Sequence, residues 1–175
     1  MKLVFSVTMA VMMAGGSTHA SDAEVKMHIA TTGGPGKLAG TVVITASDQG
    51  AVFTVKLGDM KPLSRHGFHV HANGDCGPAA KNGKVVPALA AGGHWDPENT
   101  GKHQGWQGEG HLGDLPQLQA DNEGRISALV TAPRITNVDR LKGRALMLHA
   151  NGDNYADTPK KLGGGGARLL CGVIE

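Results

Sequence analysis

Aromatic side chains are scarce in this chain of 175 residues, where they make up 3% of the sequence, whereas glycine occurs 27 times. Few rings and many glycines favour tight turns and short strands over long helices. The length is that of a single domain with enough material for a hydrophobic core. We therefore expect one all-β domain.

An excess of charge of either sign is also absent. The chain has 17 Lys and Arg residues against 15 Asp and Glu residues, a net charge of +2, and its basic residues form no run. Nucleic-acid-binding proteins gather Lys and Arg on one face. The balance indicates a mixed, solvated surface and no nucleic-acid partner.

The apolar stretch at the N-terminus is too short to cross a bilayer comfortably. Lys2 precedes this stretch, which runs from Leu3 to Ala14, and the small-x-small sequence Thr18-His19-Ala20 follows it. Signal peptides combine these three regions. We predict that residues 1–20 are a signal peptide cleaved after Ala20, that residues 21–175 are the functional domain, and that the processed protein has no membrane partner. An uncleaved anchor is the alternative.

Cysteine is limited to two residues, Cys76 and Cys171, both in the part expected to be exported. An oxidising compartment would join them, and we predict this disulfide, with two buried free thiols as the alternative. Four of the seven methionines lie in the signal segment. A Met-rich copper carrier is therefore disfavoured.

Histidine, in contrast, is concentrated in the middle of the chain. His69 and His71 are two residues apart, so on a strand both imidazoles point from one face and can meet one ion. A glycine-rich segment then supplies further donors that can surround a second ion. Imidazoles with one carboxylate suit zinc, copper, iron or nickel rather than calcium or magnesium. The candidate ligands are His69, His71, His94, His103, His111, Asp114 and His149.

The number of donors leaves two arrangements open. Two closed four-coordinate sites need eight donors, so these seven suffice only if one imidazole bridges both ions through its two nitrogens. Alternatively, a closed site of four lies beside an open site of three donors and a water, as in catalytic zinc enzymes. Spacing alone does not choose between them.

Alternation of polar and apolar residues predicts strands, which we expect at residues 24–29, 41–46, 51–57, 67–72, 125–131, 144–150 and 168–173. We also expect a short helix at residues 137–142. Short strands with long intervening loops indicate a Greek-key β-sandwich or flattened barrel. Two long loops, residues 72–115 and 151–167, are expected to cover the two-metal site. Gly163 to Gly166, in the second of these loops, predict a close approach of the backbone to another group.

Five segments together resemble one family, the copper/zinc superoxide dismutases of the bacterial periplasmic kind. The resemblance covers nearly all of the chain after the signal segment. The segments are Gly67-Phe68-His69-Val70-His71, Gly92-Gly93-His94, Gly110-His111-Leu112-Gly113-Asp114-Leu115, Leu148-His149, and Gly163 to Gly166 followed by Arg168-Leu169-Leu170-Cys171-Gly172.

The resemblance implies a periplasmic enzyme that converts superoxide to dioxygen and hydrogen peroxide, with one copper and one zinc per subunit. It assigns copper to His69, His71, His94 and His149, and zinc to His94, His103, His111 and Asp114. His94 is then the bridge and a proton donor. Arg168 would attract and bind the anion, Asp153 would accept hydrogen bonds from a histidine of each site, and the disulfide would hold Arg168 near copper.

Two other functions remain open at this stage. A non-catalytic protein that stores copper or zinc would need the ligands but not Arg168. A zinc hydrolase would need a general base, for which Glu98 and Glu109 are the candidates. We also expect a homodimer through the Trp95 region, because Trp95 follows His94 and Trp106 lies in the same loop; inward packing of these rings is the alternative.

Overall fold

The computed structural model describes residues 23–175, and its strands follow the predicted alternation. In β1 (Ala23–Thr31) the apolar residues Val25 and Met27 are buried, and the polar residues between them face outward. β2 (Gly34–Ser47) and β3 (Gly50–Leu57) form the predicted hairpin. The side chain of Ser47 closes its turn by donating to the carbonyl of Gly50.

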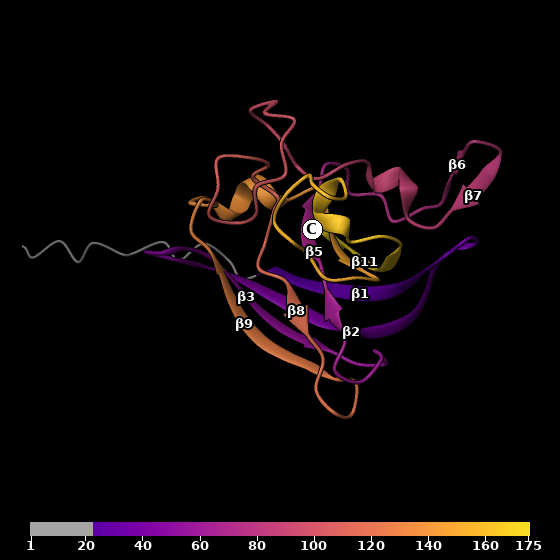
Figure 1. Cartoon of the computed structure of the whole chain (residues 1–175). Helices are drawn as coiled ribbons and strands as arrows, with labels where there is room; N and C mark the ends of the chain where they lie inside the picture. The colour runs from indigo at the N-terminus through magenta and orange to yellow at the C-terminus, as the bar shows by residue number, and fades with distance from the viewer. Residues whose placement is uncertain (1–22) are drawn as a thin grey trace, which may run out of the picture.

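The main sheet is antiparallel, and its strand order is β5-β10-β11-β1-β2-β3-β9. After β3 the chain crosses to the far edge of the sheet as β5, and it later returns to pair with β3 as β9, which is the Greek-key crossing. The sheet curls around its core, as the nested strands of Figure 1 show. The remaining strands of this sheet are β5 (Phe68–His71), β9 (Ile126–Ala132), β10 (Arg144–His149) and β11 (Arg168–Ile174).

One short pairing joins the two edges of the sheet. β4 (Arg65–His66), just before β5, pairs with β8 (Leu118–Gln119), just before β9. Inside the curl, Phe53 of β3 and Phe68 of β5 meet edge to face, with ring centroids 6.0 Å apart. Both rings are fully buried. The all-β Greek-key prediction is confirmed.

The two long loops contain local structure that the sequence reading missed. In the first loop (residues 72–115), β6 (Ala79–Lys81) and β7 (Lys84–Val86) form a hairpin that projects from the body in Figure 1. Asn82 and Gly83 form its two-residue turn with φ of 52° and 73°. Such a turn requires positive φ at both positions, which Asn-Gly adopts readily. The Asn-Gly pair was therefore a usable signal.

Helical structure in residues 23–175 is confined to three 3-10 turns, η1 (Leu89–Ala91), η2 (Val138–Leu141) and η3 (Leu162–Gly164). The helix predicted at 137–142 is thus a single turn, capped by the Asn137 side chain, which accepts from the Asp139 amide. No helix in this part of the chain has the length and apolar character needed to span a membrane. The signal peptide predicted at residues 1–20 lies outside the described residues.

The predicted disulfide between Cys76 and Cys171 is present. It joins the first loop to β11, and the two residues are 95 positions apart. In the chain-entropy model, a crosslink that closes a loop of this length stabilises the fold by about 4–5 kcal/mol, because it lowers the conformational entropy of the unfolded chain. The bond also fixes the first loop close to Arg168, which lies three residues before Cys171 on the same strand.

We predict that replacing both cysteines by serine lowers the free energy of unfolding by about 2–5 kcal/mol. Urea denaturation of the metal-free variant and of the metal-free oxidised wild type measures this difference. Reduced wild type should unfold at the same urea concentration as the variant. Equal midpoints for the oxidised wild type and the variant would contradict the prediction.

Candidate metal centre

The first donor group is built on the edge strand β5. His69 and His71 alternate with Phe68 and Val70, and all four residues are buried because both faces of this strand are covered. His149 ends the neighbouring strand β10, and its amide donates to the Gly67 carbonyl at 2.8 Å. His94, from the first loop, pairs with His71 as an isolated bridge. Strand pairing thus brings three separate segments to one point.

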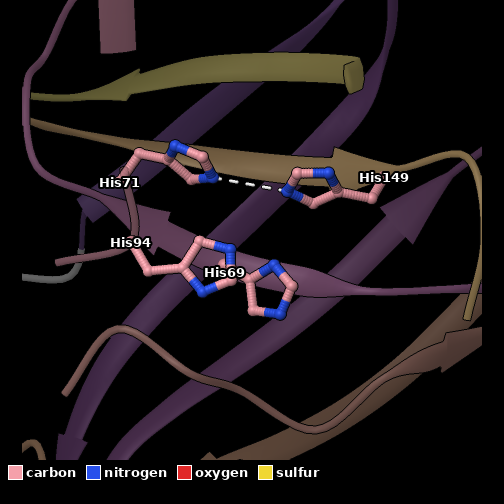
Figure 2. Close-up of side chains that lie close together, drawn as sticks. All are labelled: His69, His71, His94 and His149. Atoms are coloured by element: carbon pink, nitrogen blue, oxygen red, sulfur yellow. Dashed lines mark hydrogen bonds between the residues drawn. The ribbon is translucent and has the colours of Figure 1, made fainter. Parts of the chain in front are cut away.

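The four imidazoles of this group converge, as Figure 2 shows. His71 and His149 direct their Nε2 atoms at each other across 3.3 Å. Their Nδ1 atoms lie 2.9 Å from the Gly92 carbonyl and 3.3 Å from the Gly166 carbonyl, respectively. Because a carbonyl only accepts, both Nδ1 atoms carry the proton, and both Nε2 atoms present lone pairs. Facing lone pairs with no proton between them fit a shared cation.

Asp153 commits two further imidazoles in the same way. Its carboxylate oxygens lie 2.8 Å from His69 Nε2 and 2.8 Å from His103 Nε2. The opposite nitrogens, His69 Nδ1 and His103 Nδ1, are buried without a hydrogen-bond partner, and so is His111 Nδ1. Unpaired buried nitrogens are costly unless something binds them. These atoms therefore fit metal ligation.

The second donor group surrounds Asp114. Oδ1 of this residue lies 2.9 Å from His94 Nδ1 and 3.4 Å from His111 Nδ1, and Oδ2 lies 3.0 Å from His103 Nδ1. The last contact lacks hydrogen-bond alignment, since His103 Nδ1 has no hydrogen-bond partner. Asp114 Oδ2 and His103 Nδ1 are instead placed so that both can bind one ion.

His69 and His111 differ in how closely they approach this second group. Donor atoms within 4.8 Å of one another come from His69, His94, His103 and Asp114, while His111 Nδ1 lies 3.4 Å from Asp114 Oδ1. The His69 ring stacks on His94 with centroids 3.9 Å apart, which explains its proximity. His94 thus belongs to both groups.

The protonation of these residues follows from burial and from their carboxylate neighbours. Burial, reinforced by His94, lowers the pKa of His69 to about 3 and that of His149 to about 4. Burial would lower the pKa of His103 as well, but Asp114 and Asp153 outweigh it and raise this pKa to about 9. Burial would raise the pKa of the Asp114 and Asp153 carboxyls, but their hydrogen bonds with histidines hold each pKa below its usual range.

Arg168, the first residue of β11, lies beside the first donor group. Its guanidinium donates to the carbonyls of Ala88 and Gly92, which fixes it against the first loop. The charge faces a cavity of about 330 Å³. The polar residues that line this cavity are Lys81, His71, His94, His149, Lys161 and Arg168.

Several residues near the site were missed by the sequence reading. Lys81 and Lys161 line the cavity, although each lies in a loop and neither belongs to a motif. Tyr155 accepts a hydrogen bond from the Gln117 amide at 3.0 Å. Asp157 accepts one from the His103 amide at 2.9 Å. No local pattern marks such contacts, because the partners lie 38 and 54 residues apart.

The other residues singled out from the sequence have ordinary surroundings. His66 is buried, with Nδ1 2.7 Å from the His149 carbonyl and Nε2 2.6 Å from Ser64 Oγ. The candidate general bases Glu98 and Glu109 are both exposed and do not line the cavity. A hydrolase with either as its base is therefore not supported.

Trp95 corrects one expectation. Its side chain is only 3% exposed, so the ring packs inward and cannot be the anchor of a dimer. The guanidinium groups of Arg140 and Arg144 lie 5.2 and 4.2 Å from its centroid. Cation–π contacts of this kind hold the ring in place. Trp106 is partly buried in the same loop.

Comparison with known proteins agrees with this geometry. A family model described as copper/zinc superoxide dismutase (SODC) matches residues 38–174. The chain belongs to the copper/zinc superoxide dismutase family. Its function is therefore the conversion of superoxide to dioxygen and hydrogen peroxide with copper and zinc.

Known proteins share both the fold and much of the sequence with this chain. A superoxide dismutase (Cu-Zn) 2 of Salmonella typhimurium is 51% identical over 170 residues, covering 97% of this chain and 98% of the relative. The Cu/Zn superoxide dismutase from Brucella abortus matches with a TM-score of 0.87 at 52% identity, over 89% of this chain and 100% of that one. The monomeric copper, zinc superoxide dismutase from Salmonella enterica gives a TM-score of 0.79 with the same identity and coverage.

For the metal-free dismutase we predict a stability that falls on both sides of neutral pH. Unfolded histidines titrate near 6.5, whereas folded His69 and His149 stay neutral down to about 3 and 4, so the unfolded state binds more protons and stability falls as the pH drops below 6.5. His103 contributes stability that is complete below 6.5 and is lost as the pH rises through about 9. Chemical denaturation at pH 5, 6.5 and 9 checks this, and equal stability at all three would contradict it.

Proposed function

We propose that His69, His71, His94 and His149 hold copper, and that His94, His103, His111 and Asp114 hold zinc. This proposal rests on where the imidazole rings carry their N–H protons. Carbonyl or carboxylate oxygens take one nitrogen of His69, His71, His103 and His149, and the free nitrogens converge. One metal cation at each group would satisfy them all.

His111 belongs to the zinc set in preference to His69 for a chemical reason. His69 Nε2 is bonded to Asp153, so this imidazole has a single free nitrogen, and the copper group uses it. His111 Nδ1 is buried without a partner and lies near Asp114.

Accessibility supports this assignment of the two metals to the two groups. The cavity reaches His71, His94 and His149 of the first group, and so admits a small anion there. The side chains of His103 and Asp114 are 0% exposed, which describes a closed site. Zinc favours closed tetrahedral sites of nitrogen and oxygen ligands, and a redox metal needs the open one.

When bound, copper would supply one-electron redox chemistry, so that one superoxide is oxidised to dioxygen and a second, with two protons, is reduced to hydrogen peroxide. Arg168 binds the anion in the cavity through its guanidinium, which two loop carbonyls hold in place. Because that group is partly buried, its charge acts on the substrate with less screening than a surface charge.

His94 has the proton-carrying role. Its Nδ1 faces Asp114 and the zinc side at 2.9 Å, which leaves Nε2 for the copper side. Whenever Nε2 is free it can hold a proton, and that proton then lies beside the anion that becomes peroxide. Burial lowers the pKa of this imidazole, so a proton held there is readily given up.

Lys81 and Lys161 extend the positive field outward along the cavity wall. One comes from the β6–β7 strands and the other from the loop before η3, so the two approach the entrance from separate segments. Positive charge that lines a cleft raises the rate at which an anion enters it. This supports superoxide as the substrate.

The cellular location and the assembly are extensions of the same proposal. Residues 1–20 are a signal peptide, residues 21–175 the enzyme, and the compartment is the periplasm, which the predicted cleavage site and the disulfide between Cys76 and Cys171 support. The homodimer stays a prediction. Trp106 is the remaining tryptophan that can support it, because Trp95 is buried.

A prediction for the ligands separates the two metals. His71→Ala removes a donor of the copper set alone, so the variant should keep zinc while losing most copper and nearly all activity. Asp114→Ala should lose zinc and thermal stability more than activity per bound copper. Metal analysis with superoxide-consumption assays measures both, and a His71→Ala protein with full copper and full activity would refute the copper assignment.

A second prediction concerns the guanidinium. Arg168→Glu reverses the charge beside copper, so turnover should fall strongly with both metals still bound, and wild-type kcat/KM should fall as ionic strength rises. Arg168→Lys should give an intermediate rate, because it keeps the charge but loses the fork geometry. An active Glu variant together with a salt-independent wild type would reduce Arg168 to a structural residue.

A further inference from the structure

Asp153 is not the only residue of the second loop (residues 151–167) that forms hydrogen bonds with the first loop or with residues next to it. The Tyr155 hydroxyl accepts from the Gln117 amide at 3.0 Å, just beyond the first loop. Asp157 accepts from the His103 amide at 2.9 Å through Oδ2. The backbone of a proposed zinc ligand is thus held by a residue that is itself no ligand.

The same carboxylate has a second partner on the cavity side. Asp157 Oδ1 accepts from the Leu162 amide at 3.1 Å. Leu162 and the adjacent Lys161 line the cavity that contains Arg168. One carboxylate therefore joins the backbone of the zinc side to the backbone of the cavity wall.

We propose that Asp157 is a positioning residue that couples zinc binding to the placement of Lys161 and Leu162 at the cavity wall. Zinc fixes His103, the His103 amide fixes the carboxylate, and the carboxylate fixes the turn that presents Lys161. The inference rests on the proposed zinc set. Its consequence is that zinc shapes the entry path of the anion as well as the metal site.

Asp157→Asn is the informative substitution because an amide has one acceptor oxygen where the carboxylate has two. Asn at this position can accept from His103 or from Leu162 but not from both, and its NH₂ group then faces the other amide. The side-chain volume is nearly unchanged. The bridge is broken while the loop keeps its packing.

Asn154 offers a matched control within the same loop. Its side chain accepts from the Ala156 amide and donates to the Thr158 carbonyl, both at 3.0 Å, so its side-chain contacts stay inside the second loop. Asn154→Ala therefore disturbs the loop locally without touching the first loop. Any effect of loop disorder alone should appear in this variant as well.

The test is amide hydrogen exchange followed by NMR on the copper-free full chain, with and without one equivalent of Zn²⁺. In wild type and in Asn154→Ala, zinc should slow exchange at Leu162. In Asp157→Asn, zinc should still bind, with an affinity lower by about tenfold, the usual effect of losing an outer contact, but exchange at Leu162 should no longer respond to it.

Zinc-dependent protection of Leu162 in Asp157→Asn equal to that of wild type, or no such protection in wild type, would overturn the coupling. A wild type that binds no zinc would instead defeat the zinc set. Kinetics gives a second measurement: the salt dependence of kcat/KM should be weaker in zinc-loaded Asp157→Asn than in zinc-loaded wild type, and zinc-free wild type should show the same weakening. A salt dependence equal to that of zinc-loaded wild type would count against the proposal.

Discussion

The free edge of β5 is the constraint on which the rest of the site depends. Only one side of this strand pairs with β10, so the backbone groups of Val70 on the other side need partners. The Val70 amide donates to the Gly113 carbonyl and the Val70 carbonyl accepts from the Trp95 amide, each at 2.8 Å. These bonds place His94 and Asp114 next to His71 and His69. An unfinished sheet edge thereby becomes the frame for two metal ions.

Packing around the loops keeps that frame rigid without a large aromatic core. The Trp95 ring is held by two arginines, and one of them, Arg144, also donates to the Ala72 carbonyl directly after His71. Gly163, with φ of 67°, lies so close to Asp153 that any side chain would overlap the carboxylate. The backbone of the glycine-rich stretch therefore packs closely against another group, as its sequence predicted. The loops are held in place by individual polar contacts, each of which requires a specific geometry.

The sequence predicted the features that repeat or that carry their own chemistry. Alternation identified the strands of the main sheet, and the i,i+2 spacing of His69 and His71 identified a shared ligand face. The sequence could not predict the β4–β8 pairing or the Asp157 bridge, whose partners are far apart in the chain. Trp95 shows the limit of composition: a ring beside a metal loop suggests an interface, but burial depends on Arg140 and Arg144, which only the fold brings near.

The position of His94 favours the proposed bridged pair over an open zinc site. An open three-ligand site would leave one group without His94, yet His94 stacks on His69 while its Nδ1 meets Asp114, so it is shared by position. Asp153 then ties the groups together from behind, since its two oxygens bond His69 on one side and His103 on the other. In the proposed assignment, a change at either metal would reach the other through one imidazole and one carboxylate. His103 is also joined to the cavity wall through Asp157, so the proposed coupling would extend from the metals to the path by which the substrate arrives.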